Sequence, residues 1–297
     1  MKNFTVSVVI PNLNGEKLLE KNLPSLFLAK DNPENRILEI IIVDDGSSDG
    51  SVKLITSKFS QIKLIKHKTN RGFSASVNTG VRAAKGDLIL LINTDVIPAE
   101  DFLIPVFKHF ENNKVFAVSL HEKEFGWAKG SFFDGYIQLA MGKESVEPHS
   151  SLYVSGGSGV FRRGTWMELN GMDEKLLSPF YWEDIDICYR AAKRGYVNLW
   201  EPDGHVMHNH ESTISKFTKS YVQRIRERNQ LLVIWKNIHS PSLFRKHLMG
   251  VLRRTISHPG YLRIILMAVG RLGTALKGRK REIKLSKVSD EAIFSRF

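Results

Sequence analysis

The sequence has little cysteine and no long apolar run. Its 297 residues include one cysteine, Cys188, so a disulfide within the chain is excluded. The longest apolar stretch near the C-terminus, Ile264 to Gly270, is far shorter than the roughly 20 residues that cross a bilayer. The apolar run that follows Met1 is too short for a signal peptide. We therefore expect a cytoplasmic protein without disulfides or a transmembrane segment.

Acidic residues are scarce in the last third of the chain. Residues 212–297 contain nineteen Lys and Arg but four Asp and Glu, whereas residues 1–211 contain 24 basic and 27 acidic residues. The net charge of +12 therefore arises from the C-terminal stretch. This change in composition predicts a domain boundary near residue 211. We expect one domain over 1–211 and a basic, amphipathic helical region over 212–297.

The first hundred residues alternate between strand and helix patterns. β-Branched runs typical of buried strands occupy residues 5–10, 38–43, 62–66 and 87–92. Helical patterns lie between them, over residues 16–29, 51–59 and 74–85. This alternation predicts an α/β fold with a doubly wound, mostly parallel sheet. A fourth helix is predicted further along the chain, over residues 185–194.

Polar residues follow the predicted strands at the points where the strands end. They are Asn12, Asn14, Asp44, Asp45, Asn70, Asn93 and Asp95. Because ligands of doubly wound sheets bind at the carboxyl ends of the strands, we expect these side chains to share one rim. This convergence is the first indication of a binding site.

Two adjacent carboxylates, Asp44 and Asp45, follow the second predicted strand. They could accept hydrogen bonds from a nucleotide base and from ribose hydroxyls, while Gly46 allows a tight turn. Asp and Ser residues also cap turns that lead from a strand into a helix. The segment by itself is compatible with both interpretations.

The tripeptide Asn93-Thr94-Asp95 is a candidate metal site. A carboxylate at the end of the fourth strand could hold Mg²⁺ or Mn²⁺ against the phosphates of a nucleoside diphosphate. The later pair His208-x-His210 could supply one more ligand to the same ion. The alternatives are a simple turn at the tripeptide and histidines that are structural or solvated.

Carboxylates cluster at the start of the fourth predicted helix. The segment FYWEDID places Glu183, Asp184 and Asp186 on or beside its first turn. A helix N-terminus favours the ionised form of an acid, as a general base requires. Trp182 offers a flat face on which a sugar ring could rest. Helix capping is the alternative interpretation, and Asp186 could instead pair with Arg190.

In this order, the segments resemble glycosyltransferase family two, whose members have the GT-A fold. The resemblance covers roughly residues 5–215. It is carried by VSVVIPNLNG, IIIVDDGSSDGS, NRGFSASVNTGVRAAKGDLILLINTDV, SGGSGVFRRGTW, NGMDEKL, FYWEDIDICYRAAKRGY and VMHNHES. The subgroup that it looks most like contains bacterial rhamnosyl- and galactofuranosyl-type transferases of surface-polysaccharide assembly. The resemblance implies an inverting enzyme that moves a sugar from a nucleotide-diphosphate sugar to a hydroxyl of a glycan or polyprenyl-linked acceptor.

The resemblance also implies roles for single residues. Asp184 would be the catalytic base, and Glu183 would hold the acceptor or orient the loop. Asp95 and His208 would bind Mg²⁺ or Mn²⁺, although the first position of the metal motif is Asn93, a weaker ligand than Asp. The substrate contacts that the resemblance implies are Pro11, Asn14, Asp44, Asp45, Gly72, Asn78, Asn93, Gly157 and Trp182.

Two other functions are compatible with acidic residues at the rim of a doubly wound sheet. A nucleotidyltransferase would need a Gly-rich phosphate loop near the first strand, and the segment PNLNGEKL does not supply one. A module that binds a sugar nucleotide without turnover is the second alternative.

The basic C-terminal region is predicted to form three helices, over residues 221–235, 243–254 and 261–276. Basic amphipathic helices can lie on an anionic membrane surface, and a polyprenyl-linked acceptor would place the enzyme peripherally at the inner face of the cell membrane. Alternatively, the helices pack on the first domain or on a second subunit of a homo-oligomer. No nucleic-acid recognition motif accompanies the charge, so nucleic acid is not an expected partner.

Overall fold

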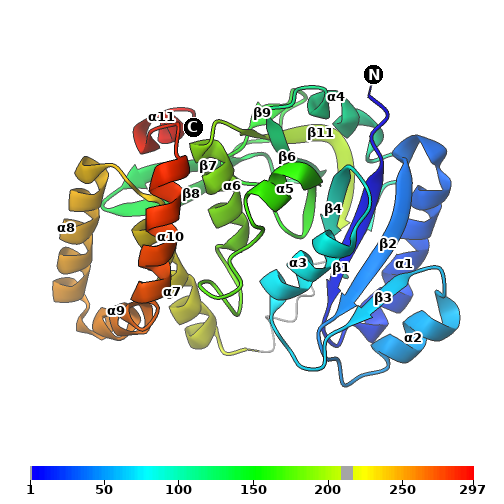
Figure 1. Cartoon of the computed structure of the whole chain (residues 1–297), viewed down its shortest axis with the longest axis horizontal. Coiled ribbons are helices and arrows are strands. Elements are labelled where there is room, and N and C mark those ends of the chain that lie inside the picture. Colours follow the sequence, from blue (N-terminus) through cyan, green and yellow to red (C-terminus); the bar gives the residue numbers. More distant parts are fainter. Residues whose placement is uncertain (1, 209–216) are drawn as a thin grey trace.

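A curled sheet forms the centre of the computed structural model, which describes residues 2–208 and 217–297 (Figure 1). Its strands are β1 (Val6–Asn12), β2 (Ile37–Asp44), β3 (Lys63–Lys66), β4 (Leu88–Ile92), β5 (Val96–Pro98), β6 (Val115–Glu122), β9 (His149–Ser150), β10 (Ser158–Arg162) and β11 (Val197–His208). They lie in the order β3-β2-β1-β4-β10-β6-β11-β5, with β9 paired to β11. The strands β1 to β4 are parallel, as predicted, so their carboxyl ends share one edge.

Helices cover both faces of this sheet. They are α1 (Glu16–Asp31), α2 (Ser51–Lys58), α3 (Phe73–Ala83), α4 (Phe107–Phe110), α5 (Arg163–Glu168) and α6 (Glu183–Lys193), with short 3-10 turns at Pro33–Asn35 and Ile104–Val106. One hydrophobic cluster joins α1, α2 and α4 to one face, for example through Leu23 and Leu54. A second joins α3, α5 and α6 to the other, for example through Val77, Trp166 and Ile187. The α/β prediction is therefore confirmed.

The C-terminal region is helical, as predicted. Its helices are α7 (Lys219–Asn237), α8 (Pro241–Ser257), α9 (Leu262–Val269), α10 (Leu272–Leu285) and α11 (Asp290–Phe294), with a 3-10 turn at Pro259–Tyr261. The prediction of one helix over 261–276 is wrong, because α9 ends at Val269 and α10 begins at Leu272. Within the described ranges, no helix combines the length and the apolar composition that a membrane crossing requires.

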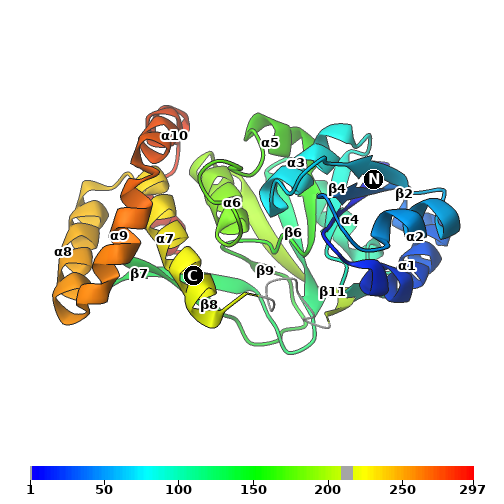
Figure 2. The same ribbon diagram turned by 90° about the horizontal axis from the view of Figure 1, so that it is seen from below.

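The C-terminal helices pack against the rest of the chain. A third hydrophobic cluster combines Ile185 and Tyr189 of α6 with side chains of α7 to α11. A hairpin of β7 (Ala128–Phe133) and β8 (Tyr136–Met141) joins the same side, where Gln230 Nε2 donates to Ile137 O at 2.7 Å. Figure 2 shows α7 lying between this helical end and α6. The predicted boundary at residue 211 lies outside the described residues and stays a prediction.

Candidate active site

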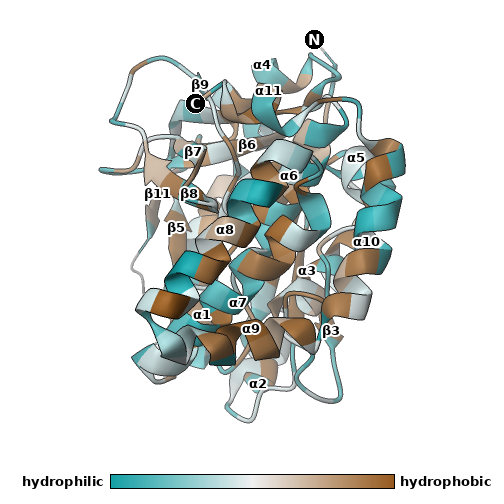
Figure 3. Cartoon of the chain, turned by 90° about the vertical axis from the view of Figure 1, so that its left-hand side faces the viewer, coloured by the Kyte–Doolittle hydropathy of each residue, from teal (hydrophilic) through white to brown (hydrophobic). Residues whose placement is uncertain are grey.

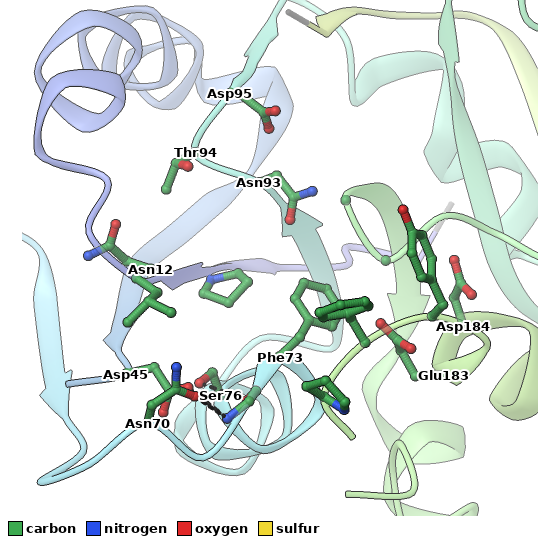
Figure 4. A pocket seen from close by; sticks show the side chains of 18 of the residues that line it. Asn12, Asp45, Asn70, Phe73, Ser76, Asn93, Thr94, Asp95, Glu183 and Asp184 are labelled. Carbon is green, nitrogen blue, oxygen red and sulfur yellow. Dashed lines mark hydrogen bonds between the residues drawn. The ribbon is translucent and has the colours of Figure 1, made fainter. Parts of the chain in front are cut away.

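A pocket of about 310 Å³ opens at the carboxyl ends of β1, β2 and β4. Figure 4 shows three sides of the pocket. Asp45 and Asn70 form the first side, and Asn93 and Asp95 form the second. Glu183 and Asp184 lie opposite the first side. The predicted site residues that line it are Pro11, Asp45, Gly72, Asn93, Asp95, Gly157, Glu183 and Asp184. The other predicted residues, which lie behind this wall, are Asn14, Asp44, Asn78, Trp182 and His208.

Asp45 anchors the loop that forms one wall of the pocket. Its carboxylate is buried and accepts hydrogen bonds from the backbone N–H groups of Arg71 at 2.9 Å and Gly72 at 2.8 Å. His67 Nδ1 lies 2.7 Å from Asp45 Oδ1 on the inner side. Gly72 has φ +90°, a backbone conformation that favours glycine. Asp45 therefore shapes the loop from Asn70 to Phe73, which contributes Asn70, Gly72 and Phe73 to the pocket.

Asp44 and Asn14 support the turn after β2 from outside the pocket. Asp44 accepts hydrogen bonds from Asn12 Nδ2 at 2.9 Å and from Ser47 N at 3.1 Å. Asn14 Oδ1 accepts from Ser48 N at 2.8 Å. Asp44 therefore holds the turn, as the second interpretation of the Asp-Asp segment expects, and Asp45 holds a wall of the pocket, while a contact of either carboxylate with a nucleotide stays a prediction.

Asn78 has a similar supporting position on α3. Its side chain is buried, donates to Met172 O at 2.8 Å and accepts from Met172 N at 3.0 Å. A further hydrogen bond of 2.9 Å joins Asn78 Nδ2 to Glu174. These contacts fix the segment that leads to the pocket-lining residues Pro179 to Tyr181.

Asp95 and His208 lie together because β5 and β11 pair antiparallel, with His208 opposite Val96. Asp95 Oδ1 is 3.2 Å from His208 Nε2, and His208 Nδ1 is 3.2 Å from Glu122 Oε2. Burial opposes a charge on His208, but the contacts with Asp95 and Glu122 outweigh it and raise the histidine's pKa. Sequence reasoning missed Glu122, which no motif marks and which only the pairing of β6 with β11 brings to His208.

The chemistry of this group fits a divalent cation. A carboxylate and an imidazole are both ligands that Mn²⁺ accepts, and a ligating histidine commonly has a carboxylate at its other ring nitrogen. Asp95 and His208 would be ligands in this arrangement, and Glu122 would orient the ring. Among the described residues no three His, Cys, Asp or Glu side chains converge on one point. His210 lies outside the described residues.

Asn93 is held in the pocket wall by its neighbour Gly157. Asn93 N donates to Gly157 O at 2.9 Å, which joins the end of β4 to the segment before β10. A Cβ atom at residue 157 would lie 2.5 Å from Asn93 Nδ2. Glycine is therefore required at 157 for this position of the Asn93 amide.

Glu183 and Asp184 begin α6 and face the pocket from a buried position. Burial raises the pKa of Asp184 to about 6, although the N–H groups of Ile185 and Gly156 lower it in part. Burial and the charge of Asp184 raise the pKa of Glu183 to about 8. Among the described residues, Glu183 Oε2 has no hydrogen-bond partner. Asp184 therefore ionises first, and near neutral pH Glu183 keeps its proton.

The backbone just before α6 turns Trp182 away from the pocket. Tyr181 and Trp182 have φ values of +73° and +75°, which are uncommon for residues other than glycine. The Trp182 ring, expected to carry a sugar, is buried in the hydrophobic cluster shared with the C-terminal helices. Phe180 and Tyr181 line the pocket in its place, together with Phe73 and Phe217. The sequence FYW predicts aromatic side chains in the pocket wall, but it does not predict which of the three rings faces the pocket.

Asn229 of α7 holds the loop that contains Tyr181 and Trp182. Its buried side chain donates to three backbone carbonyls, those of Leu177 at 2.6 Å, Phe180 at 2.9 Å and Tyr181 at 2.8 Å. Arg271, just before α10, adds a hydrogen bond of 2.7 Å to Leu176 O. The C-terminal region thus positions the loop that leads into Glu183 and Asp184.

We expect Asn229→Ala to lower kcat about tenfold, with the Kd for a nucleotide unchanged. The substitution leaves buried carbonyls without a donor, which costs about 1–3 kcal/mol of folding free energy and frees the loop. The measurement is kcat and nucleotide Kd per folded molecule. The matched control is Gln230→Ala, since Gln230 bonds the hairpin instead. Equal losses in both variants would contradict a positioning role.

Comparisons with known proteins identify the family of the chain. The model of glycosyl transferase family 2 matches residues 7–164. A pre-mycofactocin glycosyltransferase of Mycobacterium tuberculosis is 30% identical over 220 residues, 70% of this chain and 43% of the relative. An N-acetylglucosaminyl-diphospho-decaprenol L-rhamnosyltransferase of the same species is 21% identical over 231 residues, 64% of this chain and 71% of the relative. The chain thus spans less than half the length of the first of these relatives.

Solved structures share the fold at low sequence identity. GalNAc-T7 with UDP, GalNAc and Mn²⁺ has a TM-score of 0.65 at 17% identity, covering 88% of this chain and 57% of that chain. The mannosyltransferase PcManGT of Pyrobaculum calidifontis, with GDP-Man and Mn²⁺, has a TM-score of 0.58 at 17% identity, covering 96% and 86%. The family match spans more than half of the chain, and these structures share its fold. The chain belongs to glycosyl transferase family 2 and has the GT-A fold.

Proposed function

We propose that this protein is an inverting glycosyltransferase that moves a sugar from a nucleotide-diphosphate sugar to an acceptor hydroxyl. The observation that carries the proposal is the position of Asp184, a buried acid that faces the Asp45 wall across one pocket. The donor's nucleotide would lie along the loop that Asp45 anchors, and its diphosphate would lie near Asn93 and Asp95. The sugar would then extend toward Glu183 and Asp184.

Asp184 acts as the general base in this mechanism. With a pKa of about 6 it is ionised at neutral pH and still basic enough to accept a proton. It takes the proton of the acceptor hydroxyl while that oxygen attacks the anomeric carbon. The bond from this carbon to the diphosphate breaks on the opposite face, so one displacement inverts the configuration. Glu183, protonated near neutral pH, donates a hydrogen bond within the acceptor side of the pocket.

Asp95 and His208 would hold Mg²⁺ or Mn²⁺ beside the diphosphate. The ion neutralises negative charge that grows on the leaving diphosphate. Two structures with the same fold contain Mn²⁺ together with a nucleotide or a nucleotide sugar, which supports the assignment. The neutral Asn93 amide borders the same space and can donate a hydrogen bond to a phosphate oxygen.

The acceptor that we propose is a glycan or a polyprenyl-linked glycan used in cell-surface polysaccharide assembly. Support comes from the relative named as a rhamnosyltransferase of a diphospho-decaprenol. The acceptor side of the pocket is also aromatic, with Phe180, Tyr181 and Phe217 in its wall. Aromatic faces pack well against the apolar faces of sugar rings.

A panel of nucleotide sugars should identify at least one that releases its nucleoside diphosphate when Mg²⁺ or Mn²⁺ and a glycan acceptor are present. The anomeric configuration of the product, measured by NMR, is expected to be opposite to that of the donor. Retention of configuration would contradict the single displacement. Binding of a donor without release or transfer would identify a binding module instead.

We expect His208→Ala to raise the Mn²⁺ concentration needed for half-maximal activity at least tenfold, because one of the proposed ligands is lost. The measurement is a Mn²⁺ titration of nucleoside diphosphate release. His205→Ala is the matched control, since His205 also lies on β11 and its side chain is exposed. An unchanged titration in the His208 variant would remove this histidine from the metal site.

A further inference from the structure

The helices α8 and α9 carry an apolar surface that no described element covers. We call it the α8–α9 face; its residues are Leu248, Met249, Leu252 and Ile256 of α8, and Leu262, Leu266 and Val269 of α9. Each of these side chains is between 47% and 73% exposed. Figure 3 shows apolar segments of both helices on the side of the molecule that they form. Contiguous exposed apolar surface of this kind usually marks an interaction site.

The spacing shows that this face is a regular feature of both helices. On α8 the exposed residues follow a spacing of four, from Leu248 to Leu252 to Ile256, while His247 and Gly250 on the opposite side are buried. On α9 the exposed residues also recur every three or four positions, and Ile264 and Ala268 point inward. Each helix therefore has one apolar side in the core and a second apolar side facing outward.

The charged residues of α8 and α9 are all basic, and two of them, Arg253 and Arg254, pair with the acids Asp134 and Glu227 of neighbouring elements. Between Pro241 and Val269 the sequence contains five Lys and Arg residues and no Asp or Glu. The exposed side chains of Arg245, Lys246 and Arg263 form no ion pair with another described residue. Apolar side chains bordered by unpaired cations suit the surface of an anionic bilayer. The apolar side chains would enter the acyl boundary, and the cations would contact the anionic headgroups.

The same charges disfavour a second copy of the chain as the partner. A twofold contact would place each face against its own image. Arg245, Lys246 and Arg263 of one copy would then approach the same three residues of the other, and neither α8 nor α9 contains an acid to offset them. Such an arrangement is repulsive, whereas a bilayer that contains acidic lipid supplies the missing negative charge.

We propose that the α8–α9 face docks on an anionic membrane surface. In Figure 1, α8 and α9 lie at the left-hand end of the molecule, with α9 at its lower edge, and the carboxyl ends of β1 and β2 point to the lower side. The inference rests on the proposed function only in its purpose, because docking would hold the enzyme at the surface that carries a polyprenyl-linked acceptor. Docking itself depends on the face alone and is measurable without a substrate.

The test uses the full chain and sedimented vesicles of phosphatidylcholine with or without about 30% phosphatidylglycerol. We expect binding to the anionic vesicles that falls at high salt. The variant Leu248→Ser/Leu252→Ser/Ile256→Ser should lose at least tenfold in partition coefficient, and Arg245→Gln/Lys246→Gln/Arg263→Gln several-fold. The matched control is Leu28→Ser/Leu38→Ser, since these side chains are as exposed but lie on α1 and β2.

Equal binding to both kinds of vesicle, or full binding by the serine variant, would overturn the proposal. So would a concentration-dependent dimer that the serine variant abolishes, because the face would then be an interface between copies. Release of nucleoside diphosphate with a water-soluble acceptor is measured in parallel for all variants. Loss of vesicle binding by the serine variant with normal release supports docking through the α8–α9 face, whereas absence of release in every protein counts against the proposed function and leaves the docking result as measured.

Discussion

Asp184→Asn is expected to lower kcat by about 10³-fold, within the range that general bases contribute, while the Kd for the nucleotide changes less than twofold. The amide keeps the shape of the side chain and still accepts the hydrogen bond of 2.8 Å from Ile185 N. It cannot take up a proton from the acceptor. The measurements are single-turnover rates with the best donor and calorimetric titration with its nucleotide.

The wild-type pH profile adds a second readout for Asp184. Because burial raises the pKa of Asp184 to about 6, the basic form is lost as the pH falls through this value. We expect kcat to fall as the pH drops below about 6 and to be independent of pH just above this value. Glu183→Gln removes the negative charge that Glu183 acquires at higher pH, so the fall of kcat below about pH 6 should persist in that variant.

If the variant Asp184→Asn kept more than a tenth of the wild-type kcat, another residue would be the base.

Lys236→Met is expected to lower the free energy of unfolding by about 3–5 kcal/mol, the usual effect of removing one partner from a buried ion pair. Lys236 is fully buried in α7, and its ammonium lies 3.0 Å from Asp186 and 2.8 Å from Asp173. The substitution leaves Asp186 buried with Arg190 and Asn237 as its remaining partners. Urea denaturation followed by circular dichroism measures the change.

Two further variants distinguish the ion pair from the loss of side-chain packing. Lys277→Met on α10 removes an exposed lysine and should change the stability by less than about 0.5 kcal/mol. Lys236→Met/Asp173→Asn removes both charges of the Lys236–Asp173 pair and should recover part of the loss, since the single variant leaves Asp173 without its cation. A single Lys236 variant within 1 kcal/mol of the wild type would show that the pair contributes little to stability.

The N-terminal sheet could be predicted because its signals are local. Short β-branched runs such as Leu88 to Ile92, followed by polar residues, mark both a buried strand and the edge where ligands bind. The rim residues Asp45, Asn93 and Asp95 line the pocket for this reason. The sequence does not predict which of Asp44 and Asp45 lines the pocket, because the direction of each side chain depends on the turn that follows the strand.

The structure of the pocket wall before α6 was harder to predict, because contacts with residues far away in the sequence determine it. The orientation of Trp182 follows from two consecutive residues with positive φ, and these are held by hydrogen bonds from Asn229, 47 residues away in α7. Glu122 reaches His208 through strand pairing over 86 residues. The break between α9 and α10 likewise was not predicted, since apolar residues at helical spacing resume with Leu272 and Leu276 after Gly270 and Arg271.

The hydrogen bonds from Asn229 and Arg271 to the loop before α6 have a consequence for synthesis on the ribosome. The carbonyl groups of Leu176, Leu177 and Tyr181 emerge well before the two side chains that bind them. A nascent chain that has completed the sheet and α6 still lacks the donors that hold Asp184 in place. We therefore expect the loop before α6 to reach its final position only after α7 and the start of α10 have left the exit tunnel.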